Sequence, residues 1–250
     1  MDYNSKNICL ALKKANIKKG DIILCHSNLG FFGKPKGIKN PNSLCRLFFK
    51  SFMNVLGEDG TLIVPTFSYS FFKKEKFIVN TKSEMGIFSE YVRNLTKSKR
   101  SMDPNFSVSV YGKNKEYFCD TILNNTYDDE SFFGKFHKKN GKIVTLNFLG
   151  STILHYYERK LKVPYRFDKK FFGTVNGKKE IWVVFSRYLN KKFVHDPLPI
   201  TKILRKKKYF FRSRLGKGEI TSISSENFYR TVKNSLKNNK YILTEHHKHK

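Results

Sequence analysis

The chain has 250 residues, and 49 Lys and Arg against 20 Asp and Glu give it a formal net charge of +29. It contains no run of about 18 apolar residues, which argues against a membrane-spanning helix. Its N-terminus has neither the basic flank nor the apolar core of a secretory signal. Four scattered cysteines without a CxxC pair (Cys9, Cys25, Cys45 and Cys119) argue against a disulfide framework or a zinc site, and they indicate reduced thiols in a cytoplasmic protein.

The positive charge is the one feature that favours nucleic-acid binding. Its distribution argues against that as the main function, because the lysines are spread along the whole chain in pairs and triplets. No RNP-like aromatic motif, zinc-finger spacing or helix-turn-helix pattern accompanies them. We therefore expect nucleic acid not to be the partner and the charge to favour small anionic molecules that carry phosphates.

The first half of the chain alternates helices and strands. Ser5 is placed to cap a first helix, and an apolar strand is predicted at Ile22 to Cys25. In the following segment, His26 to Gly30, a hydroxyl and free backbone N–H groups form a suitable cradle for phosphate, although an ordinary turn between a strand and a helix has the same pattern. The later elements are predicted as a helix opened by Asn42, a strand at residues 61–64, a helix capped by Ser83, a strand that ends at Gly112 and a helix near residues 115–123.

The stretch NFLGSTILHYYE, residues 147–158, is the strongest functional candidate. A buried strand is predicted at residues 143–149, and Ser151 and Thr152 follow as candidate N-cap residues of a helix. In that helix Thr152, His155 and Glu158 fall at successive i, i+3 steps, so His155 shares a face with each of the other two. A hydroxyl, an imidazole and a carboxylate then converge at the carboxyl end of a strand, where α/β sheets place ligands. The alternative is a half-buried histidine on an amphipathic helix with a solvated glutamate beside it.

The C-terminal part begins with an extended segment at residues 163–168. Asn176 and Gly177 predict a hairpin turn, and a returning strand follows at residues 180–185. A short helix after Pro197, a basic strand-like segment, a turn at Gly216 and Gly218, and a helix from about 225 to 236 complete the prediction. Residues 246–250 are expected to form a basic tail.

Six segments, taken in their order, resemble the aminoglycoside 3-N-acetyltransferase family, whose members acetylate amino sugars with acetyl-CoA. The segments are GDIILCHSNLGFFG, LGEDGTLIVPTFS, SEMGIFSEYVR, RSMDPNFSVSVYG, SFFGKF and LGSTILHYYE. The resemblance covers about residues 18–173 and extends loosely over the C-terminal third. It implies a single α/β domain, residues 1–245, with a central mixed sheet flanked by helices. Residues 1–173 are then the cofactor and catalytic part, and residues 174–245 complete the acceptor site.

The resemblance also implies residue roles. His155 is the general base, Thr152 belongs to the same catalytic cluster, and Glu158 orients the ring or receives the acceptor's cationic amine. Acetyl-CoA is the acyl donor, and no metal is required. The expected cofactor contacts are Ser27, Asn28, Leu29 and Gly30 along the CoA arm, with Thr66, Ser68 and Ser107 near the cofactor.

Three departures from the family pattern bear on the acceptor. Asp103 stands where the family usually has His before Pro, Asn28 replaces the second Ser of the family's HSSL, and the chain is unusually basic. We therefore expect a negatively charged amino sugar, such as a nucleotide-linked one, in preference to a polycationic drug. The segment VPYRFDKKFFG is similar to family members that look like sugar-modifying enzymes of surface-polysaccharide clusters.

Two other classes of function stay open at this point. One is a nucleic-acid-binding protein on an enzyme-like scaffold, motivated by the charge. The other is a cysteine or serine acyl hydrolase, motivated by Cys25 beside His26, although neighbouring residues of a strand point to opposite faces. The sequence leaves the oligomeric state open, with a homodimer among the alternatives.

Overall fold

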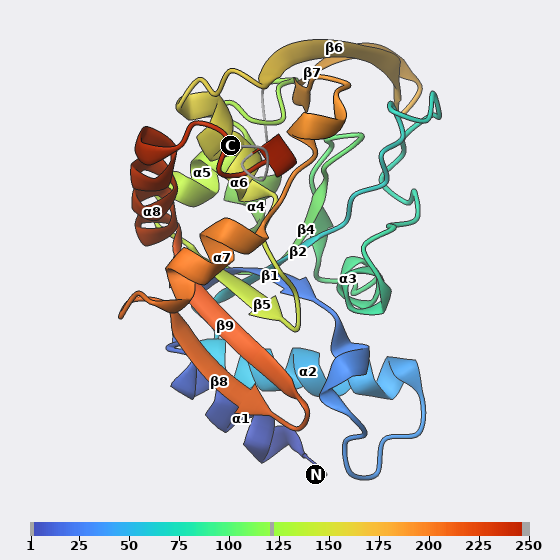
Figure 1. Cartoon of the computed structure of the whole chain (residues 1–250). Coiled ribbons are helices and arrows are strands. Elements are labelled where there is room, and N and C mark those ends of the chain that lie inside the picture. Colours follow the sequence, from blue (N-terminus) through green and yellow to red (C-terminus); the bar gives the residue numbers. More distant parts are fainter. Residues whose placement is uncertain (1–2, 121–122, 247–250) are drawn as a thin grey trace.

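A seven-stranded mixed sheet forms the centre of the computed structural model, which describes residues 3–120 and 123–246 (Figure 1). The strand order is β3-β4-β2-β1-β5-β9-β8. The strands are β1 (Ile22–Ser27), β2 (Thr61–Pro65), β3 (Lys99–Arg100), β4 (Val108–Gly112), β5 (Lys142–Leu146), β8 (Phe211–Leu215) and β9 (Gly218–Ser224). The predicted α/β fold with a mixed sheet is confirmed.

Strand β1 is the centre of the sheet and pairs in parallel with β2 on one side and β5 on the other. The remaining pairings are antiparallel. The chain passes from β1 to β2 and later returns to the opposite side of β1 as β5. Such a reversal opens a crevice at the carboxyl ends of the parallel strands, the usual ligand position in α/β sheets.

Helices cover both faces of the sheet (Figure 1). They are α1 (Ser5–Lys14), α2 (Pro41–Leu56), α3 (Ile87–Arg93), α4 (Lys115–Cys119), α5 (Phe132–Lys138), α6 (Ile153–Lys160), α7 (Leu198–Arg205) and α8 (Ser225–Asn238), with short 3-10 turns η1 (Leu29–Phe32) and η2 (Lys191–Phe193). Side chains of β1 alternate between two cores: Ile23 and Cys25 pack with α1 and α2, whereas Leu24 packs with α5, α6 and α8. None of the described helices is long and apolar enough to cross a membrane.

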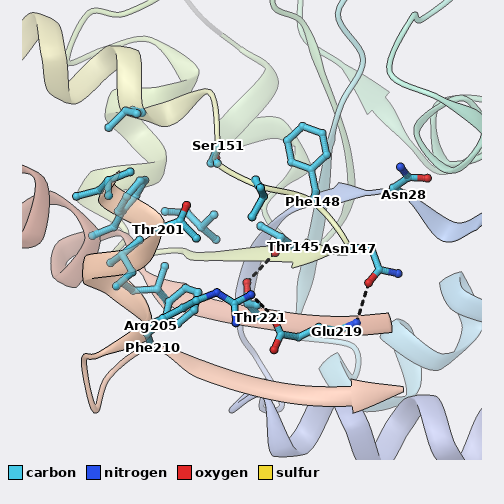
Figure 2. Close-up of a pocket in the computed structure, with 18 of the residues that line it drawn as sticks. Asn28, Thr145, Asn147, Phe148, Ser151, Thr201, Arg205, Phe210, Glu219 and Thr221 are labelled. Atoms are coloured by element: carbon cyan, nitrogen blue, oxygen red, sulfur yellow. Dashed lines mark hydrogen bonds and ion pairs between the residues drawn. The ribbon is translucent and has the colours of Figure 1, made fainter. Parts of the chain in front are cut away.

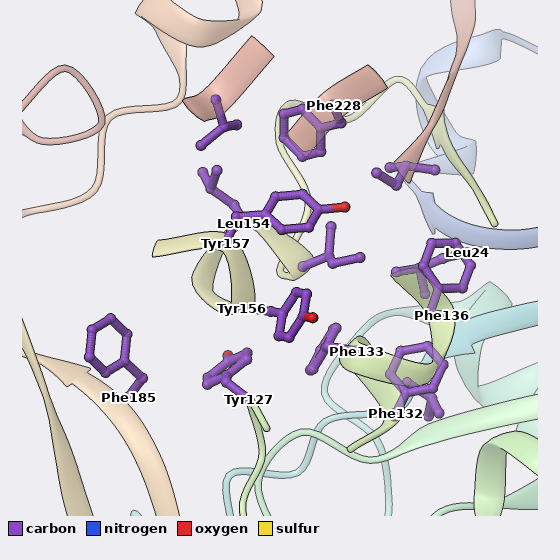
Figure 3. Close-up of a cluster of buried hydrophobic side chains, with 14 of the residues drawn as sticks. Leu24, Tyr127, Phe132, Phe133, Phe136, Leu154, Tyr156, Tyr157, Phe185 and Phe228 are labelled. Carbon is purple, nitrogen blue, oxygen red and sulfur yellow. The ribbon is translucent and has the colours of Figure 1, made fainter. Parts of the chain in front are cut away.

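The core around α6 is unusually aromatic (Figure 3). Tyr156 and Tyr157 of α6 are buried, and the Tyr157 hydroxyl donates to the Ser225 carbonyl at the start of α8 (2.9 Å). The ring of Tyr127 stacks on Phe133 of α5, with centroids 5.1 Å apart. Because both helices are fixed by large buried rings, the side chains on the remaining face of α6 have a fixed position.

Strands β6 (Arg166–Val175) and β7 (Lys178–Arg187) form a separate antiparallel hairpin. Its turn is the predicted Asn-Gly pair, and φ is +47° at Asn176 and +84° at Gly177. Two consecutive positive φ angles are the requirement of the tight turn that this dipeptide favours. The predicted hairpin is confirmed, with both strands longer than expected.

Two predicted helix starts are wrong by one or two residues. The cap of α1 is Asn4 instead of Ser5, because the Asn4 and Asn7 side chains each accept from the other's backbone N–H. The cap of α2 is Asn40 instead of Asn42, because its side chain accepts from the Ser43 N–H (2.8 Å) and Pro41 takes the first helical position.

Two other boundaries are also wrong. Helix α3 begins at Ile87 instead of near Ser83, since Gly86 has φ +87° and cannot continue a helix. Strand β5 ends at Leu146 instead of Leu149, because Asn147 has φ +50° and turns the chain, and its Oδ1 accepts from the Glu219 N–H (2.7 Å).

The ends of two further predicted segments fall partly outside the described residues. Helix α4 ends at Cys119, and residues 121–122 of the predicted helix are outside the description. Of the predicted tail 246–250, the structure describes His246 alone, whose ring packs on Tyr241 with centroids 4.4 Å apart.

Candidate active site

The structure joins His155 and Glu158 on one face of α6, as their spacing predicts. The Nδ1 of His155 lies 2.6 Å from Oε2 of Glu158. The His155 side chain is 21% exposed, whereas that of Glu158 is 0% exposed. An ionised carboxylate can only accept hydrogen bonds, so Nδ1 of the neutral His155 ring must carry the proton. Nε2 is then the ring nitrogen with a free lone pair.

Glu158 is held by three partners at once. The Tyr165 hydroxyl donates to its Oε1 (2.9 Å), and the Arg166 Nε lies 2.8 Å from its Oε2. Burial alone would raise the pKa of Glu158, but the charge of Arg166 and the hydrogen bond from His155 hold it below its usual value. The carboxylate is therefore ionised at neutral pH and orients the imidazole. Its full burial favours this orienting role over contact with an acceptor amine.

His155 is neutral at neutral pH. Burial, and then the nearby charge of Arg166, lowers its pKa to about 4, although Glu158 acts in the opposite direction. Its ring also makes edge contacts with the rings of Tyr127 and His195, with centroids 5.9 and 5.6 Å apart. A neutral, oriented and partly exposed imidazole is the form of histidine that accepts a proton.

Thr152, the third member of the predicted cluster, is half-buried at the N-cap position of α6. Its carbonyl accepts from the His155 N–H (3.0 Å). Within residues 3–120 and 123–246 its hydroxyl has no hydrogen-bond partner. The hydroxyl is thus available at the helix start, but the structure does not join it to the His155 ring.

A cavity of about 620 Å³ opens beside the start of α6, at the carboxyl ends of β1 and β5 (Figure 2). Ser151 and Leu154 supply the α6 wall, and His155 itself is not among the lining residues. The other walls come from the loop after β5, from α7, from β9 and from the first residues of α8. The cavity is therefore at the crevice that the strand order predicts.

The predicted cofactor loop reaches this cavity through one residue. Asn28 is exposed and lines the cavity, Ser27 is half-buried, Leu29 is buried and Gly30 is exposed. The Asn28 N–H donates to the Leu146 carbonyl (2.8 Å), so this amide is not free for a phosphate.

His26 and Ser151 connect β1 to the start of α6. Their side chains are buried, and Ser151 Oγ lies 2.9 Å from His26 Nε2. The ring of Phe148 stacks on His26 with centroids 5.5 Å apart, and burial lowers the pKa of His26 to about 4. Sequence reasoning missed this pair, which holds the cavity wall in place.

Thr66, Ser68 and Ser107 lie in a buried polar network instead of an open cleft. All three are almost fully buried. Arg100 donates to the Thr66 carbonyl (2.6 Å) and to Ser107 Oγ (3.1 Å), and Ser68 Oγ donates to the Pro104 carbonyl (3.0 Å). Their predicted proximity to a cofactor stays a prediction.

Asp103, which stands in place of the family histidine, is part of the same region. Its Oδ1 accepts from the N–H groups of Asn105 (2.9 Å) and Phe106 (2.8 Å), and its Oδ2 accepts from the Thr126 hydroxyl (2.6 Å). The carboxyl therefore organises a turn and joins it to the segment before Tyr127. Burial raises its pKa.

Three residues of the site were missed from the sequence: Tyr165, Arg166 and His195. The first two belong to the segment VPYRFD, predicted only as extended, and an arginine beside an aromatic residue just after a candidate catalytic helix was the available signal. His195 follows the hairpin and carries no local motif.

Neither a reactive thiol nor a metal centre emerges from the described residues. All four cysteines are free, and burial raises the pKa of Cys25 well above its usual value. The part of the chain that the structure describes contains no group of three His, Cys, Asp or Glu side chains able to hold a metal ion.

Solved structures with the same fold include aminoglycoside acetyltransferases. The apoenzyme of AAC(3)-IVa matches with a TM-score of 0.79 and 20% identity, over 97% of this chain and 92% of that chain. AAC-IIIb in a binary complex with CoASH matches with a TM-score of 0.80 and 13% identity, over 95% of this chain and 97% of that chain. The YokD protein from Bacillus subtilis matches with a TM-score of 0.78 and 18% identity, over 96% of this chain and 95% of that chain.

No protein with a curated description matches the sequence. The family model described as aminoglycoside 3-N-acetyltransferase, however, matches residues 24–237. That range includes His155, Glu158 and the whole hairpin, and it extends well beyond the part of the chain in which the sequence motifs are clear. The chain therefore belongs to the aminoglycoside 3-N-acetyltransferase family and is an acyltransferase.

Proposed function

We propose that this enzyme transfers an acetyl group from acetyl-CoA to the amine of an amino sugar, with His155 as general base. The observation that carries the proposal is the 2.6 Å contact between His155 Nδ1 and the buried Glu158, which leaves Nε2 free on a partly exposed ring. An amino-sugar nitrogen is mostly ammonium at pH 7, and only its free base attacks a thioester. A neutral imidazole beside the amine can take that proton.

The chemistry needs no covalent intermediate. Nε2 of His155 removes a proton from the ammonium, and the amine attacks the thioester carbonyl. The resulting oxyanion needs a donor, and the unpartnered Thr152 hydroxyl at the start of α6 is a candidate. The tetrahedral species then loses the second amine proton to solvent and its carbon–sulfur bond breaks. The amide remains on the sugar, and the CoA thiolate takes up the proton held by His155.

We place the donor in the cavity of 620 Å³ that Asn28, Ser151 and Leu154 line. AAC-IIIb, which has the same fold, was solved with CoASH. The exposed Lys217 lies at the wall of this cavity and supplies positive charge for the phosphates of CoA, whereas Arg205 at the same wall is paired with Glu219. The four free thiols agree with an enzyme of the cytoplasm.

We further propose that the acceptor is anionic, as in a nucleotide-linked amino sugar of the kind used for surface polysaccharides. The net charge of +29 attracts anions. The acidic segment at residues 128–130 does not offset it, because each carboxylate is already paired: Asp128 with Arg159 (3.5 Å), Asp129 with Lys160 (3.0 Å) and Glu130 with Lys138.

A thiol-release assay with acetyl-CoA tests this proposal. The panel contains nucleotide-linked amino sugars, the matching free amino sugars and gentamicin-type drugs. We expect the nucleotide-linked acceptors to have the highest kcat/KM and their advantage to shrink as salt rises. Efficient turnover of the drugs with none of the nucleotide sugars would reverse the acceptor assignment. Absence of thiol release with every acceptor would remove the proposed reaction.

A further inference from the structure

The cavity beside α6 has two chemically different ends. Its inner end is lined by buried apolar side chains from five elements of the fold. They are Ile143 of β5, Leu154 of α6, Ile200 and Leu204 of α7, Ile223 of β9 and Phe228 of α8. Figure 2 shows Thr201 of α7 toward this end and Asn28 toward the other, with the start of α6 between them.

The outer end offers polar groups that lack partners. The Nδ2 of Asn147 is buried without a hydrogen-bond partner among the described residues, while its Oδ1 is used by Glu219. Asn28 and Lys217 are exposed on the same side. Such donors suit the amide carbonyls and phosphates of the CoA arm.

The hydroxyls between the two ends each make one hydrogen bond within the protein. Thr145 and Thr221 bond to each other (2.7 Å), and the Thr201 hydroxyl donates to the Pro197 carbonyl (2.7 Å). An amide of the pantetheine arm placed among the six apolar side chains of the inner end would lose its hydrogen bonds to water without replacement. A hydrocarbon chain has no such cost.

We propose that the inner end binds the acyl chain of the donor, and that the enzyme binds acyl-CoA donors with unbranched chains longer than acetyl more tightly than it binds acetyl-CoA. This inference rests on the proposed acyl transfer and refines its donor. The acyl group is the one part of an acyl-CoA without groups that need hydrogen bonds beyond the thioester. If the thioester lies against Ser151, its carbonyl is at the start of α6, the helix that carries His155. The acyl chain then extends toward Leu204 and Phe228. Acetyl would leave this apolar volume empty.

The test measures binding of CoA, acetyl-CoA and hexanoyl-CoA by titration calorimetry, which needs no acceptor. Each buried methylene contributes about fourfold in affinity, so even partial burial of four added methylenes predicts at least about tenfold tighter binding of hexanoyl-CoA than of acetyl-CoA. We also expect a more negative heat-capacity change for hexanoyl-CoA, the mark of apolar burial.

Two matched variants of α7 locate the chain. Leu204→Trp fills the inner end, since Leu204 is 6% exposed and lines it, whereas Leu198→Trp makes the same change at a position that is 48% exposed on the same helix. Leu204→Trp should abolish the advantage of hexanoyl-CoA and leave CoA and acetyl-CoA binding unchanged. Leu198→Trp should change neither. Melting temperatures confirm that both variants are folded.

The outcomes separate this inference from the proposed function. Binding of CoA and acetyl-CoA with no gain for hexanoyl-CoA overturns the acyl-chain site and leaves acetyl transfer intact. Loss of CoA binding itself in Leu204→Trp assigns the inner end to the pantetheine arm and also overturns the inference. If the wild-type enzyme binds none of the three, the proposed function fails with it.

Discussion

The buried ion pair between Arg166 and Glu158 makes a quantitative prediction for Arg166→Met. The substitution keeps most of the side-chain volume but removes the cation that lies 2.8 Å from a carboxylate that is 0% exposed. Removing one partner of a buried pair leaves an uncompensated charge, which costs about 3–5 kcal/mol of the free energy of unfolding. For a domain of this size that corresponds to a fall in melting temperature of about 6–20 °C.

The sign of the pH dependence is equally specific. In the wild-type enzyme the pKa of Glu158 is lowered, so its stabilising contribution is complete above the usual carboxyl value and is lost as pH falls through the lowered value. Without Arg166, burial dominates and the pKa of Glu158 rises. Arg166→Met should therefore be most destabilised relative to wild type at pH 7–8, and the difference should narrow as pH falls.

Urea unfolding of the wild-type enzyme and three variants checks this reasoning. Glu158→Gln added to Arg166→Met removes the unpaired charge, so the double variant should be more stable than Arg166→Met alone. Lys170→Met, on an exposed position of the same strand, is the control and should change stability by less than about 0.5 kcal/mol. A loss below about 1 kcal/mol in Arg166→Met, or no recovery in the double variant, would refute the buried-pair account.

Three further predictions follow from the same geometry. Acetyl-CoA at about 100 times its dissociation constant should add about 2.7 kcal/mol to stability and raise the melting temperature with dose, whereas an unchanged melting curve argues against donor binding. A thiol reagent should modify half-buried Cys9 well before Cys25 in the native enzyme, since burial raises the pKa of Cys25, and equal rates would contradict its placement in the core. Because the pKa of His26 is lowered to about 4, its contribution to stability is complete above pH 6.5 and is lost as pH falls toward 4. His26→Gln should therefore reduce the pH slope of the unfolding free energy by about 1.4 kcal/mol per pH unit in that window. An unchanged slope would count against the burial of a neutral His26.

The regular elements of the fold were predictable because local signals fix them. The apolar run of β1, the Asn-Gly turn at 176–177 and the polar residues near the starts of α1 and α2 are all signals from residues close in sequence. Boundaries failed where a single backbone conformation decided them, as at Gly86 and Asn147, whose positive φ is invisible in an apolar pattern.

The candidate site was predictable only along one helix. Spacing placed His155 beside Glu158, and the structure joins them. The partners that decide the state of Glu158 come from the chain after α6: Tyr165 and Arg166 reach it because the segment into β6 folds back on the helix. No periodicity encodes such a return, which is why the sequence left Glu158 as either an orienting group or an amine receptor. Its full burial favours the orienting role.

The cavity could not be predicted from sequence for a related reason. Its apolar end is assembled from β5, α6, α7, β9 and α8, and each contributes residues that read as ordinary core positions. Asn28 was found because it belongs to the loop after β1. The sequence predicted a polar group made of Thr66, Ser68 and Ser107. All three are buried, and Thr66 and Ser107 are bonded to Arg100, a residue that no motif had indicated.

The central claim is that His155 is the base, and turnover by His155→Ala tests it most directly. With the best acceptor at pH 7, kcat should fall by about 10²- to 10⁴-fold, the usual contribution of a positioned general base. Acetyl-CoA affinity should stay within about twofold because His155 does not line the donor cavity. Activity should partly recover at high pH, where the amine loses its proton unaided. Near-normal kcat at pH 7 in a folded His155→Ala enzyme would contradict the account.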